Sequence, residues 1–175
     1  MRLPCAPRLR FRELQTVPAD ADFILRLTTS EPWLRHIGDR GVRSAQDALR
    51  YIETVPRSQY AAHGFGLWGI TRLQDEASIG VCGLMSRSDL PGPDLAYALL
   101  PEYWGQGYAH EAALACLDHA RDALGLQAVY AICTLDNAAS IRLLLKHGFE
   151  GDGEHPGEQC VRLRRWRRIF GSALA

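Results

Sequence analysis

The spacing of hydrophobic and polar residues changes several times along the chain, and each stretch of constant spacing predicts one element. Leu9 and Phe11 alternate with Arg10 and Arg12, which predicts a short strand over residues 9–14. Similar alternation or short apolar runs predict further strands over residues 64–73, 79–85, 95–100, 127–134, 149–151 and 160–166. The polar residues 74–76 separate two of these strands and predict a hairpin turn.

Apolar residues at intervals of three and four predict helices between the strands. The predicted helices cover residues 19–27, 44–56, 107–125 and 137–148. Ser44 is a typical N-cap, and Pro56 is expected to end the helix that begins there. Because no repeat, linker or low-complexity segment divides the sequence, we expect one α/β domain over residues 1–175.

Composition narrows the classes of function without naming one. Lysine plus arginine and aspartate plus glutamate number 20 each, so the formal net charge is zero. This argues against nucleic acid or acidic lipid as a general partner. No apolar run approaches the ~20 residues of a membrane-spanning helix, and the first residues lack the apolar segment of a secretion signal. We therefore expect no membrane partner.

Five scattered cysteines give a second constraint: Cys5, Cys82, Cys116, Cys133 and Cys160. Their odd number and the absence of a C-x-x-C pair disfavour a disulfide framework or a zinc site, so no metal is expected. Most of them lie among apolar neighbours, as small core residues do. A reducing cytoplasm fits this pattern best.

A turn with two glycines joins the predicted strand 95–100 to the longest helix. Gly105 and Gly107 permit positive φ and carry no Cβ, so neighbouring backbone N–H groups can converge on an anion. The helix start adds unpaired donors and the positive end of its dipole. The Gly-Lys-Ser/Thr of a P-loop and the third glycine of a dinucleotide fingerprint are missing. The turn is therefore either a diphosphate site or only a tight connection.

Asn137 and Ser140 open the following helix, directly after the predicted strand that ends at Thr134. One interpretation is structural, with Asn137 as the N-cap and Ser140 in the first turn. The other is chemical and compatible with the first. Ser140 would donate a proton to a departing thiolate, whose thiol has a pKa of roughly 8.5, and Asn137 would hold an amide-bearing arm.

Two spaced motifs resemble those of RimJ/RimL-type GNAT acetyltransferases. Trp104–Ala112 reads WGQGYAHEA and is similar to the pattern W-G-x-G-x-A-x-E-A. Asn137–Ser140, followed by Leu144–Phe149, is similar to N-x-x-S…L-x-K-x-G-F. The resemblance covers most of residues 8–152. Trp104 departs from the Arg or Gln of the general superfamily pattern, although Trp is usual in this branch.

The resemblance implies a mixed, strongly twisted sheet of about seven strands, with acetyl-CoA in the splay between strands 4 and 5. Backbone N–H groups of residues 105–110 would bind the diphosphate, and residues 98–100 would pair with the pantetheine. The implied cofactor-binding residues are Ala98, Leu99, Leu100, Trp104, Gly105, Gln106, Gly107, Tyr108, Ala109, His110, Asn137 and Ser140. The implied activity is N-acetylation by direct attack of a primary amine on the thioester.

Ser140, Asn137 and Asp94 are the candidate catalytic residues. Asp94 would be the general base, since relatives often carry an acid at the start of this strand; alternatively it is only a turn residue. Glu111 is another candidate for the base, although an acid in the first helical turn is equally explained by the helix dipole. His110 and His36 are weaker candidates, and a water chain could serve instead. The donor for the oxyanion is expected to be a backbone N–H near residues 99–100.

The acceptor amine is expected to be a small molecule or a peptide N-terminus. Trp33, His36 and Tyr97 are predicted to contact it, with ordinary half-buried aromatic packing as the alternative for Trp33 and Tyr97. A homodimer stays open. A silent acyl-CoA-binding sensor or scaffold is the alternative to an enzyme. The arginines of residues 162–168 are expected to line a solvated sheet edge or, alternatively, to dock an acidic protein or RNA surface.

Overall fold

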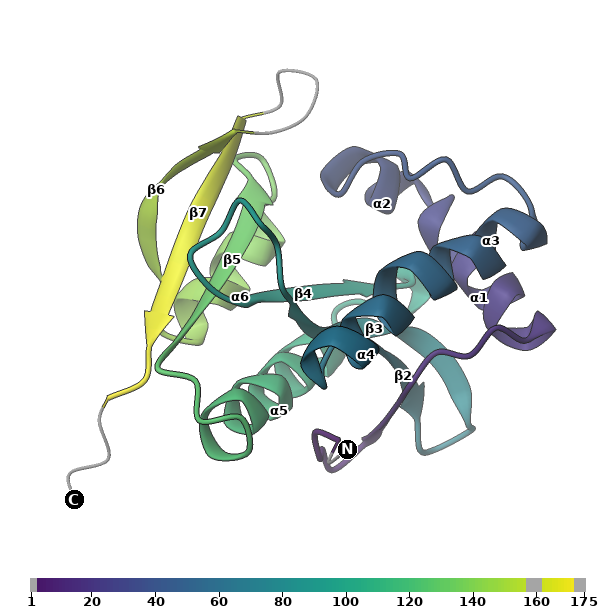
Figure 1. The fold of residues 1–175 in the computed structure, drawn as a ribbon, viewed down its shortest axis with the longest axis horizontal. Helices are drawn as coiled ribbons and strands as arrows, with labels where there is room; N and C mark the ends of the chain where they lie inside the picture. Colours follow the sequence, from purple (N-terminus) through teal and green to yellow (C-terminus); the bar gives the residue numbers. More distant parts are fainter. Residues whose placement is uncertain (1–2, 157–161, 172–175) are drawn as a thin grey trace.

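The computed structural model describes residues 3–156 and 162–171, which form a seven-stranded sheet with flanking helices (Figure 1). The strands are β1 Leu9–Arg12, β2 Leu67–Arg72, β3 Ala77–Met85, β4 Asp94–Leu99, β5 Ala128–Thr134, β6 Glu150–Pro156 and β7 Arg162–Ile169. The helices are α1 Pro18–Thr28, α2 Glu31–His36, α3 Ala45–Ile52, α4 Ser58–His63, α5 Tyr108–Asp122 and α6 Ala138–Lys146.

The sheet is mixed, which confirms the expected fold class. Its strands follow the order β1-β2-β3-β4-β5-β7-β6, and the neighbouring strands are antiparallel except for β4 and β5, which are parallel. Figure 1 shows β2–β4 and β5–β7 as two groups of strands that run in different directions. The parallel pair β4–β5 is therefore the only backbone ladder between the two halves of the described sheet.

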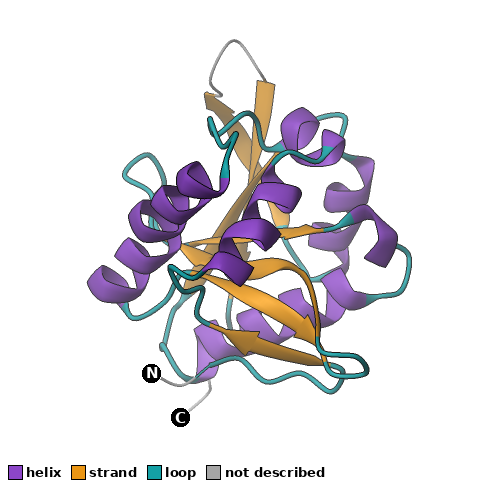
Figure 2. Cartoon of the chain, turned by 90° about the vertical axis from the view of Figure 1, so that its right-hand side faces the viewer, coloured by secondary structure: helices purple, strands orange, loops and turns teal. Residues whose placement is uncertain are grey.

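Helices cover both faces of the sheet, as Figure 2 shows from the side. Alternate residues of β4 point to opposite faces. Leu95 and Leu99 belong to a core that also contains buried residues of α5 and α6. Ala96 and Ala98 pack against the second core, which contains buried residues of α1, α2 and α3. In the part of the chain that the structure describes, no helix has the length and apolarity needed to cross a membrane.

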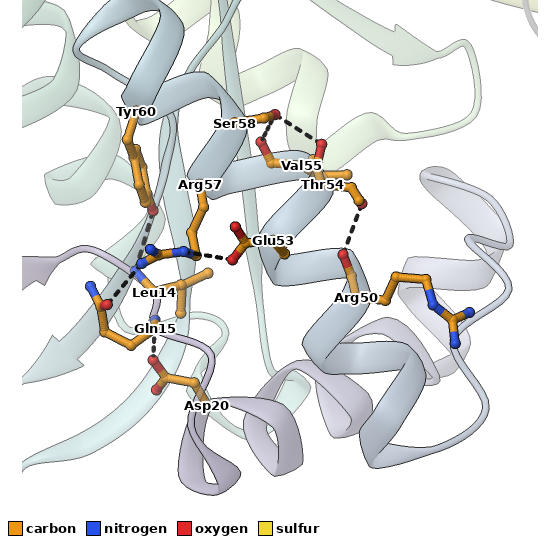
Figure 3. A network of polar contacts seen from close by, with 10 residues as sticks. All are labelled: Leu14, Gln15, Asp20, Arg50, Glu53, Thr54, Val55, Arg57, Ser58 and Tyr60. Atoms are coloured by element: carbon orange, nitrogen blue, oxygen red, sulfur yellow. Dashed lines mark hydrogen bonds and ion pairs between the residues drawn. The ribbon is translucent and has the colours of Figure 1, made fainter.

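Pro56 does not end the second predicted helix, so that prediction was wrong. The chain continues through a π-helical turn, Glu53–Arg57, directly into α4. Proline lacks the N–H that an α-helix would use, and hydroxyl groups on either side supply other bonds to helix carbonyls (Figure 3). Thr54 Oγ1 donates to Arg50 O at 2.8 Å, and Ser58 Oγ donates to Thr54 O at 2.8 Å. Ser44 does cap α3, since its Oγ accepts from Asp47 N.

Helix α2 was not predicted from the sequence. It is only six residues long, and Trp33 is its one buried residue, so its sequence carries almost no periodic signal. Its C-terminal end contacts the segment that follows β5. Arg35 Nη2 lies 3.1 Å from Asp136 Oδ2, which joins α2 to the other half of the sheet.

The arginine-rich strand lies inside the sheet, contrary to the expected sheet edge. β7 pairs with β5 on one side and with β6 on the other, and β6 is the edge strand. An edge could not be inferred from the arginines because their side chains project from the faces of the sheet, where water can still reach them. Arg165, for example, pairs with Asp152 of β6 at 2.8 Å. Cys160, with which the predicted strand began, lies outside the described residues.

Candidate active site

The two halves of the sheet separate at β4 and β5. These strands share one registered pair, Asp94 with Tyr130, and Tyr130 N donates to Pro93 O at 2.9 Å. On its other side β4 is paired with β3 along its whole length, from Asp94 to Leu99. Beyond Asp94, β4 therefore faces β5 without the regular ladder of a parallel pair, and an extended molecule with amide groups could pair there.

The register decides which backbone groups of β4 face this separation. Leu100 N donates to Ile79 O at 2.9 Å, and hydrogen-bonded pairs alternate along an antiparallel ladder. Ala98 consequently directs its N–H and C=O toward β3, while Tyr97 and Leu99 direct theirs toward β5. Leu100 O also accepts from Tyr103 N at 3.0 Å, so both backbone groups of Leu100 are engaged. Of the predicted residues 98–100, Leu99 is the one placed to pair with an extended ligand.

The turn before α5 has the backbone conformation that an anion site requires. Gly105 and Gly107 have φ values of 72° and 80°, and Gly107 is the residue that precedes the helix. Gln106 Nε2 donates to Glu102 O at 3.1 Å, which braces the turn. The predicted cofactor-binding residues Trp104, Gly105, Gln106, Gly107, Tyr108, Ala109 and His110 all lie in this turn or in the first helical turn of α5.

Trp104 links the turn to the end of β4. Its indole Nε1 donates to Leu99 O at 2.9 Å, and about half of the residue, 51%, is exposed. The Leu99 carbonyl is therefore occupied by Trp104, whereas the Leu99 N–H still faces the separation between β4 and β5. An exposed aromatic side chain at this point can also cover a molecule that lies along the strand.

Arg8, from the beginning of the chain, contacts this turn, and the sequence analysis did not identify it. It precedes β1, yet its guanidinium Nη1 donates to Gln106 O at 3.1 Å, and its Nε lies 2.6 Å from Glu111 Oε2. The guanidinium carbon also lies 4.6 Å from the centre of the Tyr108 ring. Local spacing along the sequence cannot reveal such a contact, because 103 residues separate Arg8 from Glu111.

Two histidines meet beside the start of α5. His110 Nδ1 lies 2.9 Å from Nε2 of His147, which is buried just after α6. Burial, together with the nearby His110, Arg168 and Lys146, lowers the pKa of His147 to about 4. His147 is therefore neutral at physiological pH, and its Nε2 can accept a hydrogen bond from His110 Nδ1.

Ser140 and Tyr97 place two hydroxyl groups between the diverging halves. Tyr97 Oη, from β4, lies 2.7 Å from Ser140 Oγ, from α6. Burial raises the pKa of Tyr97, and its hydrogen bond with Ser140 only partly opposes this, so the phenol keeps its proton. Asn137 Oδ1 accepts from Ser140 N at 3.0 Å, which confirms the predicted N-cap and fixes Ser140 in the first helical turn.

Asp94 is almost completely buried, with 1% of its surface exposed. Its Oδ1 accepts from Arg87 Nε at 2.9 Å. Burial raises the pKa of Asp94 to about 6, and the Arg87 charge opposes that shift. Asp94 is the first residue of β4 rather than a turn residue, and buried carboxyl groups with raised pKa values occur both at functional sites and in structural ion pairs.

The other predicted acceptor residues occupy different surroundings. Trp33 is 4% exposed, belongs to the core beside α1 and α3, and packs edge-on against Tyr51. His36, by contrast, is partly exposed and lies at the end of β5, with Nδ1 3.2 Å from Thr134 Oγ1 and 3.7 Å from Asp136 Oδ1. Tyr97 lies with Ser140. Within residues 3–156 and 162–171, no cluster of three His, Cys, Asp or Glu residues is arranged to hold a metal ion.

Comparison with known proteins decides the family. The family model described as an acetyltransferase (GNAT) domain matches residues 8–150. The chain belongs to the GNAT acetyltransferase family. An uncharacterized N-acetyltransferase of Bacillus subtilis (strain 168), YoaA, is 30% identical over 140 residues, which are 79% of this chain and 78% of that protein.

Solved structures agree with this GNAT fold. A putative GNAT-family acetyltransferase from Bordetella pertussis superposes with a TM-score of 0.80 at 20% identity, covering 97% of this chain and 100% of that one. RimL, a ribosomal L7/L12 alpha-N-protein acetyltransferase, superposes with a TM-score of 0.79 at 15% identity, covering 96% and 93%. Together with the family match, these structures confirm the GNAT fold of this acetyltransferase.

Proposed function

We propose that this acetyltransferase transfers the acetyl group of acetyl-CoA to a primary amine, on a small metabolite or a protein N-terminus, by direct attack. The observation that carries the proposal is the Tyr97–Ser140 hydroxyl pair, 2.7 Å apart, between the diverging halves of the sheet. It lies near the two kinds of binding surface that coenzyme A needs: an unpaired strand backbone for its amides and a glycine turn for its diphosphate.

The residues present fit three parts of coenzyme A: the diphosphate, the pantetheine arm and the sulfur. The N–H groups of Gly105, Gly107 and the start of α5 would hold the diphosphate, and the β4 backbone at Tyr97 and Leu99 would hold the pantetheine amides. Ser140 would face the sulfur. Bound acetyl-CoA supplies an acetyl group activated as a thioester. These assignments extend the predicted cofactor site by the backbone of Tyr97.

The two hydroxyls have distinct roles in this proposal. Either hydroxyl can donate in the bond between them; we propose that Tyr97 is the donor to Ser140 Oγ, so that the Ser140 hydroxyl can donate a hydrogen bond toward the sulfur position. A thiol has a pKa of roughly 8.5, so a hydroxyl donor stabilises its departure as a thiolate at neutral pH. Asn137 keeps Ser140 in place through the bond from Ser140 N to its Oδ1.

We propose Asp94 as the general base. It lies three residues before Tyr97 on β4, a distance of about 10 Å along a strand, and its side chain points to the opposite face. Asp94 therefore takes the amine proton through at least one water molecule rather than by direct contact. Its raised pKa, about 6, leaves it ionised and basic at neutral pH.

We place the acceptor on the side of α2, with His36 as the contacting residue. His36 is partly exposed beside the end of β5, whereas Trp33 is buried in the core. RimL, named as an acetyltransferase of a ribosomal protein N-terminus, supports the peptide option without deciding between the two. We also propose a cytoplasmic location, which the free buried cysteines Cys82, Cys116 and Cys133 support.

The decisive experiment is thiol release from acetyl-CoA in the presence of a panel of polyamines, amino sugars, amino acids and N-terminal peptides. We expect release that depends on one class of amine, with the acetylated product confirmed by mass spectrometry. Ser140→Ala serves as the matched variant, in which we expect slower release. Binding of acetyl-CoA without amine-dependent release by any member would instead support a sensor or scaffold.

A further inference from the structure

Arg8 joins the beginning of the chain to the proposed diphosphate turn. Its backbone N–H donates to Glu111 Oε1 at 2.7 Å and its side-chain Nε donates to Glu111 Oε2 at 2.6 Å, so both carboxylate oxygens hold the same residue. The side chain of Glu111 is only 14% exposed. Arg8 is therefore fixed at two points, and its Nη1 is free to reach a third, Gln106 O, at 3.1 Å.

The bond to Gln106 O controls the direction of the next N–H. The described peptide bonds are all trans, and in a trans peptide the C=O and the N–H point in opposite directions. Because Arg8 holds the Gln106 carbonyl on its own side, the Gly107 N–H points to the other side. Gly107 would otherwise turn easily, since glycine adopts positive and negative φ about equally well.

The atoms around Gly107 also show that Arg8 lies against this glycine. A Cβ atom at Gly107 would lie 3.4 Å from Arg8 Nη2, so the guanidinium packs directly against the glycine. The Tyr108 ring lies under the same guanidinium, at 4.6 Å. The Arg8 side chain, half of which is exposed, thus contacts the turn, Glu111 and Tyr108 on the side of the Gln106–Gly107 peptide that carries the carbonyl oxygen.

We propose that Arg8 is a positioning residue for the cofactor diphosphate, anchored by Glu111, and that it acts by setting the Gln106–Gly107 peptide so that the Gly107 N–H faces the anion. The proposal rests on the proposed function, which places a diphosphate at this turn. Arg8 acts through the backbone, because its guanidinium lies on the carbonyl side of the peptide. Its contribution is accordingly confined to ligands that carry the diphosphate.

Two ligands test this inference without any acceptor amine. CoA contains the diphosphate, and pantetheine contains the thiol and both amides but no phosphate. We would measure the dissociation constant of CoA by calorimetry and that of pantetheine by NMR titration. Arg8→Met should weaken CoA binding by about tenfold, the loss typical of one charge-assisted hydrogen bond, and leave pantetheine binding unchanged.

Three further variants sharpen the result. Arg8→Lys keeps the charge but loses the planar fork that holds Glu111 and Gln106 together, so it should also weaken CoA binding. Glu111→Gln should do the same by releasing Arg8. Arg10→Met is the matched control, because Arg10 lies two residues after Arg8, on β1, and forms an exposed ion pair with Glu76. It should bind CoA as the wild type does.

The outcomes separate this inference from the proposed function. Wild-type CoA affinity in folded Arg8→Met, or an equal loss of pantetheine affinity, would overturn the role of Arg8. Should Arg8→Met fail to fold, Arg8→Lys and Glu111→Gln decide by the same comparison. A wild-type protein that does not bind CoA at all would overturn the proposed function instead.

Discussion

Replacing Asp94 by asparagine should stabilise this protein at neutral pH and inactivate it. Asp94 is 1% exposed, and burial raises the pKa of its carboxyl group to about 6 from an ordinary value of 3.8. The Arg87 guanidinium, 2.9 Å away, does not compensate for the loss of water around the ionised carboxylate. The fold therefore favours the protonated form, and asparagine resembles that form in shape and charge.

The sign and size of the effect follow from proton linkage. Between pH 3.8 and about 6 the folded protein keeps a proton that the unfolded chain has lost, so stability falls as the pH rises through this window and is constant above it. A shift of about two pH units corresponds to about 3 kcal/mol. Asp94→Asn should thus gain up to about 3 kcal/mol over the wild type at pH 8 and almost nothing at pH 4.

Urea unfolding of both proteins at pH 4, 6 and 8 measures this difference. The difference between the two curves removes the contributions of every other titrating group. Asp75→Asn is a suitable control, because the exposed Asp75 pairs with Arg72 and has a lowered pKa. It should not gain stability as the pH rises. A difference between Asp94→Asn and wild type that does not change with pH, or a loss of stability at pH 8, would refute the electrostatic argument.

The same variant tests the proposed base. General base catalysis contributes on the order of 100-fold or more, so Asp94→Asn should lose that much turnover at pH 8 while it gains stability. Turnover at the wild-type rate would show that Asp94 is not the base, even if the stability measurements agree with the linkage. A stability gain together with an activity loss cannot be explained by damage to the fold.

Three further predictions concern other parts of the fold. Ser140→Ala and Tyr97→Phe should each lower thiol release by about tenfold, and the double variant should lose little more, because the hydroxyls act as a pair; additive losses would contradict this. Burial lowers the pKa of His147 from 6.5 to about 4, so the wild type should lose stability as the pH falls through that window. Thermal unfolding of His147→Gln should lack this slope, and an unchanged slope would refute the assignment. Ser44→Ala should cost about 1 kcal/mol of helix capping in urea unfolding, with unchanged thiol release; no loss would mean that its bond to Asp47 N contributes little.

Local spacing in the sequence predicted most strands and helices because their signals are contained within each element. The glycine turn and the Asn137 N-cap were found in this way, and both have the expected geometry. Pro56 and the arginine-rich strand were misjudged for a different reason. A π-helical turn with hydroxyl bonds accommodates the proline, and the position of β7 between β5 and β6 depends on the whole sheet. Neither the π-helical turn nor the position of β7 can be inferred from neighbouring residues alone.

The parts of the site that were missed are contacts between distant segments. Arg8 reaches Glu111 across 103 residues, Tyr97 reaches Ser140 across 43, and His110 reaches His147 across 37. Each pair consists of residue types that are common on protein surfaces or in cores, so nothing about either member alone indicates the other. Only the topology, which brings β1, β4 and α6 around the start of α5, creates these pairs.

The same topology explains why side chains, rather than backbone, connect the two halves of the sheet. β4 and β5 share one registered pair, at Asp94 and Tyr130, and further along β4 the Tyr97 hydroxyl contacts Ser140 of α6, the helix that follows β5. Two parallel strands that made a full ladder would leave no backbone donors for a ligand. By stopping the ladder after one pair, the fold keeps the Leu99 N–H available. The backbone bonds that the sheet lacks here are therefore those that an extended amide ligand can supply, so binding should also strengthen the contact between the two halves.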